Sequence, residues 1–232
     1  MTPRVKTMCV IFIALLWIEC HGQRRILVAA ASDLKFALDS VAAVFRKKHS
    51  GTVEITYGSS GKLFEQISNG APFDVFFSAD IEYPNKLKEK DLTASDIYIY
   101  GVGRIVVWSK KIDVAKEGMN SLRSPGVKKI AIANPLHAPY GKRAEEALKF
   151  YKMHEAVKTK LVLGDNISQT AQFVTTGAAD IGIVAYSLAL SPNRGVLSHF
   201  NTERSNGFDP GGAIPVIFET DAATTRPSFT PR

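Results

Sequence analysis

The chain is poor in cysteine and has no apolar run long enough to span a membrane. Its 232 residues include 2 cysteines, Cys9 and Cys20, both near the N-terminus. No apolar run reaches the roughly 18 residues that a membrane-spanning helix requires. Charged residues make up 22% of the chain and aromatic residues 9%, which excludes a disordered or fibrous protein. The length suits one large domain or two lobes with proper cores.

The first 22 residues have the pattern of a secretory signal peptide. Arg4 and Lys6 form a basic start, and an apolar run follows from residue 8 to 18. Gly22 then supplies the small residue at which cleavage is expected. A membrane anchor or a buried helix is the alternative, and Cys20 adds the option of lipid attachment. Cleavage predicts an exported protein without any cysteine, and so without a disulfide or a cysteine nucleophile.

The formal net charge of +7 falls to about +6 without this leader, so the basic excess belongs to the remaining body. A basic protein can attract nucleic acid, an anionic membrane or a small anion. The lysines are spread along the chain, which is typical of solvated faces. We therefore expect no nucleic-acid partner, although salt-dependent DNA binding remains a testable alternative.

Templates for catalysis and metal binding are scarce. The sequence has no His-Glu-x-x-His helix, and the histidines after the leader lack the spacing of metal ligands. They are His49, His137, His154 and His199. Ser-x-x-Lys occurs at 32–35 and 59–62, but the partner motifs of serine acyl-transferring enzymes are missing. We expect neither an enzyme nor a cofactor; a secreted hydrolase built on Ser59 or Ser60 with Lys62 is the alternative.

Strand-like and helix-like segments alternate along the chain, which predicts parallel sheets flanked by helices. Ser32 is expected to cap the first helix and Asn166 the last one. Residues 221–232 contain two prolines and no periodicity, so a flexible tail is expected there. The expected strands are 26–31, 53–57, 73–77, 97–108, 129–133, 161–163, 181–186 and 214–219. The expected helices are 33–48, 62–68, 141–153 and 167–176.

Four strand-to-helix junctions share one design, in which a small or hydroxyl-bearing residue precedes the helix. They are Ala31-Ser32-Asp33, Tyr57-Gly58-Ser59-Ser60-Gly61, Pro139-Tyr140-Gly141 and Asp165-Asn166-Ile167. Such junctions lie at the carboxyl ends of parallel strands, where ligands bind. Each helix N-terminus offers free N–H groups and a partial positive charge. One junction alone indicates ordinary capping, but four together favour a site for a small oxyanion.

At these same residues the sequence resembles the periplasmic molybdate-binding proteins of ABC transporters. The resemblance covers about residues 25 to 218, and its most specific block runs from Gly70 to Asp80. The segments that carry it are Ala29-Ala30-Ala31-Ser32, Tyr57-Gly58-Ser59-Ser60, Gly70-Ala71-Pro72-Phe73-Asp74-Val75-Phe76-Phe77-Ser78-Ala79-Asp80, Asn134-Pro135-Leu136-His137-Ala138-Pro139-Tyr140-Gly141 and Gly182-Ile183-Val184-Ala185-Tyr186.

The resemblance implies an α/β, two-lobed periplasmic-binding-protein fold of type II. Each lobe holds a parallel-type sheet flanked by helices, and the ligand cleft lies between the lobes. Residues 23–102 and 188–220 are then expected to form lobe 1, and residues 103–187 lobe 2. Family members usually continue with a helix packed on lobe 1, whereas this chain has a short tail from Asp221, so an exposed apolar patch is expected there.

The resemblance also implies a ligand set for the oxyanion. The hydroxyl groups of Ser32 and Ser60 match two ligand serines of the family, and two backbone N–H donors fall on Tyr140 and Ile167. Molybdenum would be bound only as molybdate, through these four residues. A delivery partner, the permease of an ABC transporter in the inner membrane, is implied as well, and a monomer is expected.

Tyr186 is a fifth expected ligand. Some family members use a tyrosine near the Gly-Ile-Val segment, where ungapped matching places Ala185 and leaves Tyr186 one position later; Ala185 is therefore a possible addition, and the Tyr140 phenol is the alternative donor. Ser59, which precedes Ser60 in the same turn, and Asp33 are the other possible additions. Asp33 is awkward because a carboxylate repels an anion, so its side chain is expected to complement the helix N-terminus or to face solvent. If Asp33 lined the cleft, it would have to be protonated or to accept from a protonated ligand, which would favour a phosphate-like anion.

The chemistry of molybdate agrees with a site made only of hydrogen-bond donors. Molybdate is a fully deprotonated dianion near neutral pH, whereas phosphate usually carries a proton. A donor-only site leaves that O–H unpaired, at a cost of about 1–3 kcal/mol. The residues therefore predict a receptor for molybdate or tungstate, and another oxyanion such as sulfate or phosphate is the alternative.

Overall fold

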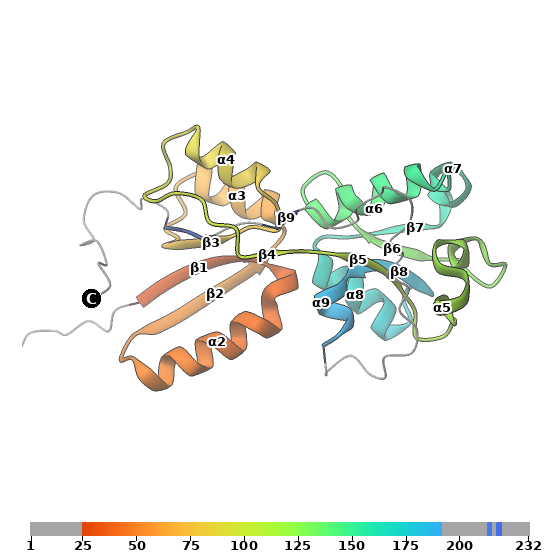
Figure 1. Cartoon of the computed structure of the whole chain (residues 1–232), viewed down its shortest axis with the longest axis horizontal. Coiled ribbons are helices and arrows are strands. Elements are labelled where there is room, and N and C mark those ends of the chain that lie inside the picture. The colour runs from red at the N-terminus through yellow and green to blue at the C-terminus, as the bar shows by residue number, and fades with distance from the viewer. Residues whose placement is uncertain (1–24, 192–212, 215–216, 220–232) are drawn as a thin grey trace, which may run out of the picture.

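A computed structural model describes residues 25–191, 213–214 and 217–219 of the chain. Two four-stranded sheets lie one beyond the other along the long axis of the molecule, and helices cover both faces of each (Figure 1). We call the unit on the first sheet, with helices α2 to α4, the first lobe. The unit on the second sheet, with helices α5 to α9, is the second lobe. The leader and the tail lie outside the described residues.

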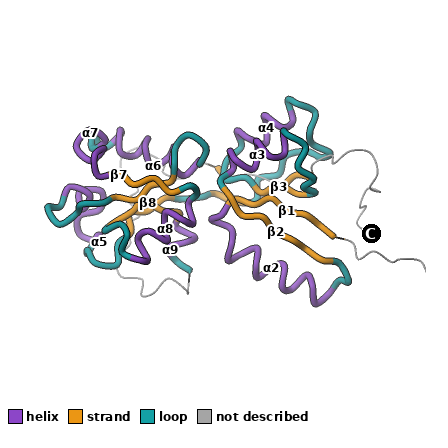
Figure 2. The backbone as a smooth tube through the Cα atoms, turned by 180° about the vertical axis from the view of Figure 1, so that it is seen from behind, coloured by secondary structure: helices purple, strands orange, loops and turns teal. Residues whose placement is uncertain are grey.

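The first sheet has the strand order β10-β3-β1-β2. Its strands are β1 (Arg25–Ala31), β2 (Thr52–Gly58), β3 (Val75–Phe77) and β10 (Ile217–Glu219). β1 pairs in parallel with both β2 and β3, and β10 pairs with β3 in the antiparallel sense. α2 (Lys35–Lys48) lies on one face, and α3 (Ser60–Ser68) and α4 (Glu82–Lys88) lie on the other (Figure 2).

The second sheet has the order β5-β8-β6-β7, with β5 antiparallel to β8 and the other pairs parallel. Its strands are β5 (Ile105–Trp108), β6 (Ile130–Ala133), β7 (Leu161–Gly164) and β8 (Ile181–Ala185). Its helices are α5 (Val114–Glu117), α6 (Pro139–Phe150), α7 (His154–Val157), α8 (Ile167–Thr176) and α9 (Tyr186–Ala189). Three short 3₁₀ helices are η1 (Ser32–Leu34), η2 (Gly118–Arg123) and η3 (Lys158–Lys160). β5, β6 and β8 are buried along their whole length, as a sheet covered on both faces requires.

The chain crosses between the lobes through residues 101–108, which Figure 1 shows as an extended segment. β4 (Gly101–Val102) pairs there with β9 (Ala213–Ile214) in an antiparallel ribbon. Strands of the first sheet thus come from both ends of the described chain, and those of the second sheet from its middle. The lobe boundaries expected from the sequence stay predictions.

The predicted strands and helices are largely present, and one helix agrees with the sequence in its ends as well. Asn166 caps α8 by accepting a hydrogen bond from the Gln169 N–H at 3.0 Å. Gly177 ends α8 in the left-handed conformation, with φ of 78°, which glycine adopts without steric cost. The prediction of parallel-type sheets flanked by helices is confirmed.

Other predictions were wrong in detail. Ser32 does not cap the first helix: residues 32–34 form η1, and α2 begins at Lys35 without a side-chain cap. The expected strand 97–108 divides into β4 and β5, and no strand is present at residues 97–100. The expected last strand, 214–219, contains parts of β9 and β10, which pair with different strands. The helix expected at 141–153 begins at Pro139 and ends at Phe150.

Within the described residues, no helix is both long and apolar enough to cross a membrane. α2 does carry exposed apolar side chains on the first lobe, Val41 at 61% and Val44 at 52% exposure. The lobes have separate cores: the larger centres on the second sheet and reaches Ala31 and Ala79 of the first lobe. The smaller packs α3 and α4 against the first sheet through Leu63, Phe76 and Leu87.

Candidate oxyanion-binding site

The starts of helices from both lobes meet where the two lobes touch. In the first lobe these are η1, which follows β1, and α3, which follows β2; in the second lobe they are α6, which follows β6, and α8, which follows β7. Hydrogen bonds join η1 to α8, η1 to α6, and the start of α3 to the loop before α6. All four junctions predicted from the sequence are therefore brought to one place.

Ser32 lies against the N-terminus of α8 and is almost fully buried. Its Oγ accepts a hydrogen bond from the Ser168 N–H at 3.2 Å and donates to Asn166 Oδ1 at 3.1 Å. Ser168 Oγ in turn donates to the Ser32 carbonyl oxygen at 2.9 Å. Ser32 thus reaches across the lobe interface to the start of α8, where the partial positive charge of the helix lies.

Ser60 is the first residue of α3 and has no exposed surface. Its Oγ accepts a hydrogen bond from the Ala79 N–H at 2.8 Å. A hydroxyl group that accepts in this way keeps its own hydrogen for donation to an oxyanion. Ser60 therefore occupies the position expected of a donor at the start of a helix.

Ser59 and Gly61, on either side of Ser60, both contact His137 of the second lobe. Ser59 Oγ and His137 Nδ1 are 2.8 Å apart, and the Gly61 N–H donates to the His137 carbonyl oxygen at 2.9 Å. A Cβ atom on Gly61 would lie 2.6 Å from that carbonyl oxygen. This close approach of two backbones is possible only with glycine.

Asp33 lies in the first turn of η1 and is buried, with 5% of its surface exposed, so the expectation that its side chain faces solvent was wrong. Its Oδ2 accepts a hydrogen bond from the Tyr140 hydroxyl of α6 at 3.0 Å. Burial raises the pKa of Asp33 to about 7, and the Tyr140 hydrogen bond opposes that rise only in part. Burial and the neighbouring Asp33 raise the pKa of Tyr140 as well, so the phenol remains a donor.

Tyr140 and Ile167 lie in the first turns of α6 and α8, and both are buried. The N–H groups of a first helical turn have no partner within the helix. The backbones of Tyr140 and Ile167 therefore present donors at the lobe interface, as the sequence predicts. Whether they bind a ligand stays a prediction.

Ala185 and Tyr186 belong to a fifth junction, between β8 and α9. Ala185 is fully buried and pairs with Ile105 of β5. The Tyr186 N–H donates to the Arg104 carbonyl oxygen at 2.9 Å, so this N–H is not available to a ligand. Contact between the Tyr186 phenol and a ligand stays a prediction.

Charged pairs surround the buried contacts at the rim of the interface. Lys62 of α3 forms an ion pair with Asp165, and Lys142 of α6 forms one with Glu82 at 3.0 Å. Each pair joins the two lobes, and its side chains are about one third to one half exposed. Burial and the nearby Lys62 ammonium lower the pKa of His137, which favours a neutral ring between Ser59 and this rim.

Sequence reasoning missed four residues that build the interface. Asn166 was expected only as a helix cap, and His137 only as a surface or helix-end histidine. Ser168 and Ser187 were not expected to contribute; Ser187 Oγ donates to the Asp33 carbonyl oxygen at 3.3 Å. For Asn166, His137 and Ser168 the available signal was their position, because each lies in or within two residues of a junction that sequence reasoning singled out. Ser187 lies at the fifth junction, which was not among them.

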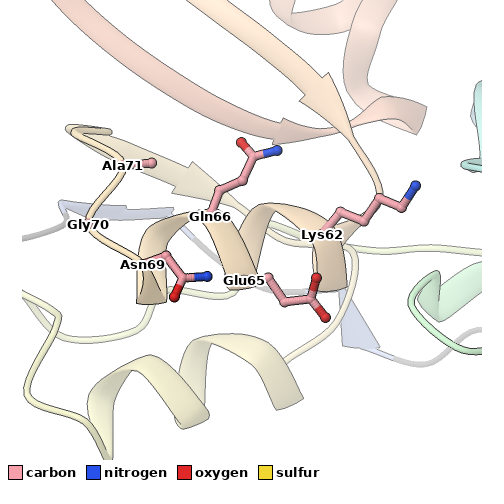
Figure 3. Close-up of a pocket in the computed structure, with 6 residues that line it drawn as sticks. All are labelled: Lys62, Glu65, Gln66, Asn69, Gly70 and Ala71. Carbon is pink, nitrogen blue, oxygen red and sulfur yellow. The ribbon is translucent and has the colours of Figure 1, made fainter.

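A surface hollow also lies along α3, away from the convergence of helix starts (Figure 3). It is lined by Lys62, Glu65, Gln66, Asn69, Gly70 and Ala71. It includes no residue of the predicted ligand set. Among the described residues, no group of three or more His, Cys, Asp or Glu side chains is placed to hold a metal ion.

Comparison with known proteins decides the family. Residues 26–205 match the family of bacterial extracellular solute-binding proteins. The chain belongs to this family. It is 39% identical over 172 residues to the molybdate-binding protein ModA of Azotobacter vinelandii. The matched region covers 73% of this chain and 68% of the relative. Identity to ModA of Rhodobacter capsulatus is 36% over 173 residues, with the same coverage. The resemblance inferred from the sequence is confirmed.

Solved structures agree with this assignment. The periplasmic molybdate-binding protein of Azotobacter vinelandii superposes with a TM-score of 0.77 and 28% identity, covering 86% of this chain and 87% of that one. The sulfate-binding protein SubI of Mycobacterium tuberculosis matches with a TM-score of 0.63 at 16% identity, over 87% of this chain and 77% of that one. The latter likeness concerns the fold alone. The two-lobed periplasmic-binding-protein fold is thereby confirmed.

Proposed function

We propose that this protein captures molybdate or tungstate outside the cytoplasm and delivers it to the permease of an ABC transporter. One observation carries the proposal: uncharged donors at four helix starts, two from each lobe, meet at a buried interface. Helix N-termini and hydroxyl groups together stabilise an oxyanion without a buried cation. The named relatives, several of which are molybdate-binding proteins, support the same ligand.

The proposed ligand contacts follow from the positions of the donors. The Ser32 and Ser60 hydroxyl groups and the Tyr140 and Ile167 N–H groups hold the four oxygens, so molybdenum itself is never touched by the protein. Ser32 gives up its bond to Asn166 when it donates to the ligand. A fully deprotonated dianion satisfies all four donors, whereas hydrogen phosphate presents an O–H that needs an acceptor.

We further propose that the leader directs export to the periplasm and is then removed. The family is extracellular, and residues 1–22 have the composition of a signal peptide. The protein would capture and release its ligand as a monomer whose two lobes close on the ligand. Lobe 1 would comprise residues 23–102 and 188–220, and lobe 2 residues 103–187. This carrier needs no cofactor beside the ligand itself.

A serine hydrolase is the competing function, because Ser59 Oγ lies 2.8 Å from His137 Nδ1. The position of Lys62 does not support a Ser-Lys hydrolase, since its ammonium group forms an ion pair with Asp165. Labelling with an acylating serine reagent tests this: modification of Ser59 or Ser60 would favour the hydrolase, and no labelling is expected.

Calorimetric titration of the protein with molybdate, tungstate, sulfate and phosphate tests the proposed function. We expect tight binding of molybdate and tungstate and much weaker binding of the other two. Tight binding of phosphate or sulfate together with no binding of molybdate would reject the proposal. Tungstate serves as an internal control, because its charge and size nearly equal those of molybdate.

A further inference from the structure

Asp33 is a buried carboxyl group beside a predicted anion ligand, and the proposed binding chemistry has no use for it. It follows Ser32 directly, and 5% of its surface is exposed. Oδ2 accepts from the Tyr140 hydroxyl, whereas Oδ1 is buried without a hydrogen-bond partner among the described residues. A buried carboxylate oxygen without a donor is costly to keep ionised.

The described residues around Asp33 offer no charged side chain of opposite sign. Its titratable neighbours are two phenols, Tyr140 from α6 and Tyr100 from the segment before β4. Burial raises the pKa of both, so each is neutral over the physiological range. The hydroxyl of Ser187, on α9, donates to the Asp33 carbonyl oxygen. The start of α8 packs against η1 through the hydrogen bond between Ser168 and Ser32. Among the described residues, no lysine or arginine contributes to the pKa of Asp33.

A dianion bound by Ser32 would therefore stand next to a carboxyl group that no cationic side chain of the described residues neutralises. Two like charges in a buried site disfavour the ionised form of the weaker acid. We propose that Asp33 is protonated in the loaded protein, so that capture of each molybdate dianion takes up one proton at this residue. The proposal rests on the proposed function, because it requires a dianionic ligand at Ser32.

The direction of the pH dependence follows from linkage. Below the pKa that Asp33 has in the protein without ligand, the group is already neutral and affinity does not change with pH. Above that pKa and below the higher value in the loaded protein, binding requires proton uptake, so affinity falls by up to tenfold for each pH unit. Burial already raises the pKa of Asp33 to about 7, which places the fall within the range from pH 7 upward.

The test combines affinity and proton counting on the full-length secreted protein. Molybdate is titrated by calorimetry from pH 6 to pH 9, in two buffers with different ionisation enthalpies at each pH. The difference in apparent enthalpy between buffers gives the number of protons taken up. Asp33→Asn keeps an acceptor for Tyr140 but cannot titrate. Asp39→Asn is the matched control, because Asp39 is an exposed carboxylate paired with Lys35 on α2.

We expect the wild-type protein and Asp39→Asn to take up close to one proton at pH 8 and to bind at least tenfold more weakly at pH 9 than at pH 7. Asp33→Asn should bind with the same affinity at both pH values and take up none. Binding of molybdate without proton uptake, or a pH dependence that persists in Asp33→Asn, would overturn the proposal while leaving the proposed function intact. Tight binding of phosphate in place of molybdate would instead show Asp33 accepting from a protonated ligand, and would reject both.

Tyr140→Phe supplies a second, independent test. Loss of the phenol removes the one side-chain hydrogen bond that lowers the pKa of Asp33. The group is then neutral to higher pH, so the fall in affinity should begin at higher pH than in the wild-type protein. A fall that begins at lower pH would contradict the role given to Asp33. Circular dichroism checks that each variant is folded.

Discussion

The interface between the lobes has two regions that use different chemistry. Its buried centre consists of uncharged groups: serine hydroxyls, backbone N–H groups and a phenol facing a carboxyl group whose pKa is about 7. Its rim consists of exposed ion pairs between lysines and carboxylates. A full charge at the centre would be buried whenever the lobes close, whereas a charge at the rim stays in water. We therefore propose that the centre recognises the ligand and the rim only assists closure.

Removal of the two central hydroxyl groups is the strongest test of the proposed difference between centre and rim. The Ser32→Ala, Ser60→Ala variant loses two hydrogen bonds to a charged ligand, each worth about 1.5–3 kcal/mol. We expect molybdate affinity to fall by roughly 10² to 10⁴-fold, measured by calorimetry. Ser40→Ala is a matched control, because Ser40 is an exposed serine on α2 that bonds its own helix. Unchanged affinity in the double variant would place the site elsewhere.

Asp33→Asn tests the chemistry of the centre through the pH dependence of the free energy of unfolding. Burial raises the pKa of Asp33 to about 7 in the folded protein, from the ordinary value of 3.8 for an exposed aspartate. Between these values the folded state binds the extra proton, so the free energy of unfolding of the wild-type protein decreases as pH rises from 4 to 7. The decrease is at most about 4 kcal/mol, and Asp33→Asn should lack it.

Thermal melting without ligand at pH 4.5 and pH 8 measures this effect. We expect the melting temperatures of variant and wild type to be similar at pH 4.5 and the variant to melt several degrees higher at pH 8. A variant that is equally destabilised at both pH values would show that the carboxyl group is an ordinary packing element, with no titration of its own.

Gly61→Ala tests the close approach of the lobes at the centre. The added Cβ would lie 2.6 Å from the carbonyl oxygen of His137 in the other lobe and 2.6 Å from the Tyr83 hydroxyl in its own lobe, so the lobes must separate locally and the Tyr83 side chain must shift. The affinity for molybdate should fall by about tenfold or more, and the melting temperature without ligand should fall as well because the contact with Tyr83 does not depend on the ligand. Gly126→Ala is the control, because a Cβ there meets nothing within 4 Å. Equal affinities for the two variants would argue that the lobes do not close in this way.

Lys62→Ala, at the rim, should have the smallest effect. Exposed ion pairs contribute about 0–1 kcal/mol, so affinity should change by less than roughly fivefold, and the difference should vanish in high salt. A loss as large as that of the double serine variant would mean that Lys62 contacts the ligand, and the division between centre and rim would be wrong.

The sequence predicted the alternation of strands and helices and the convergence of four junctions, because both depend on local patterns. Buried strands such as residues 130–133 and capped helices such as 167–176 carry their own signals. The burial of Asp33 was not predictable, since its hydrogen-bond partner Tyr140 lies 107 residues away in the chain. The expectation that Ser32 caps its own helix was wrong for the same reason, because its hydroxyl bonds to the start of α8. Local sequence patterns do not predict contacts with a lobe that is distant in the sequence.

A crystal structure of the protein with tungstate, located by its anomalous scattering, tests the central claim most directly. The account predicts one tungsten peak within hydrogen-bonding reach, through the oxygens, of Ser32 Oγ, Ser60 Oγ and the N–H groups of Tyr140 and Ile167. A peak at the rim beside Lys62, or in the hollow along α3, would contradict it.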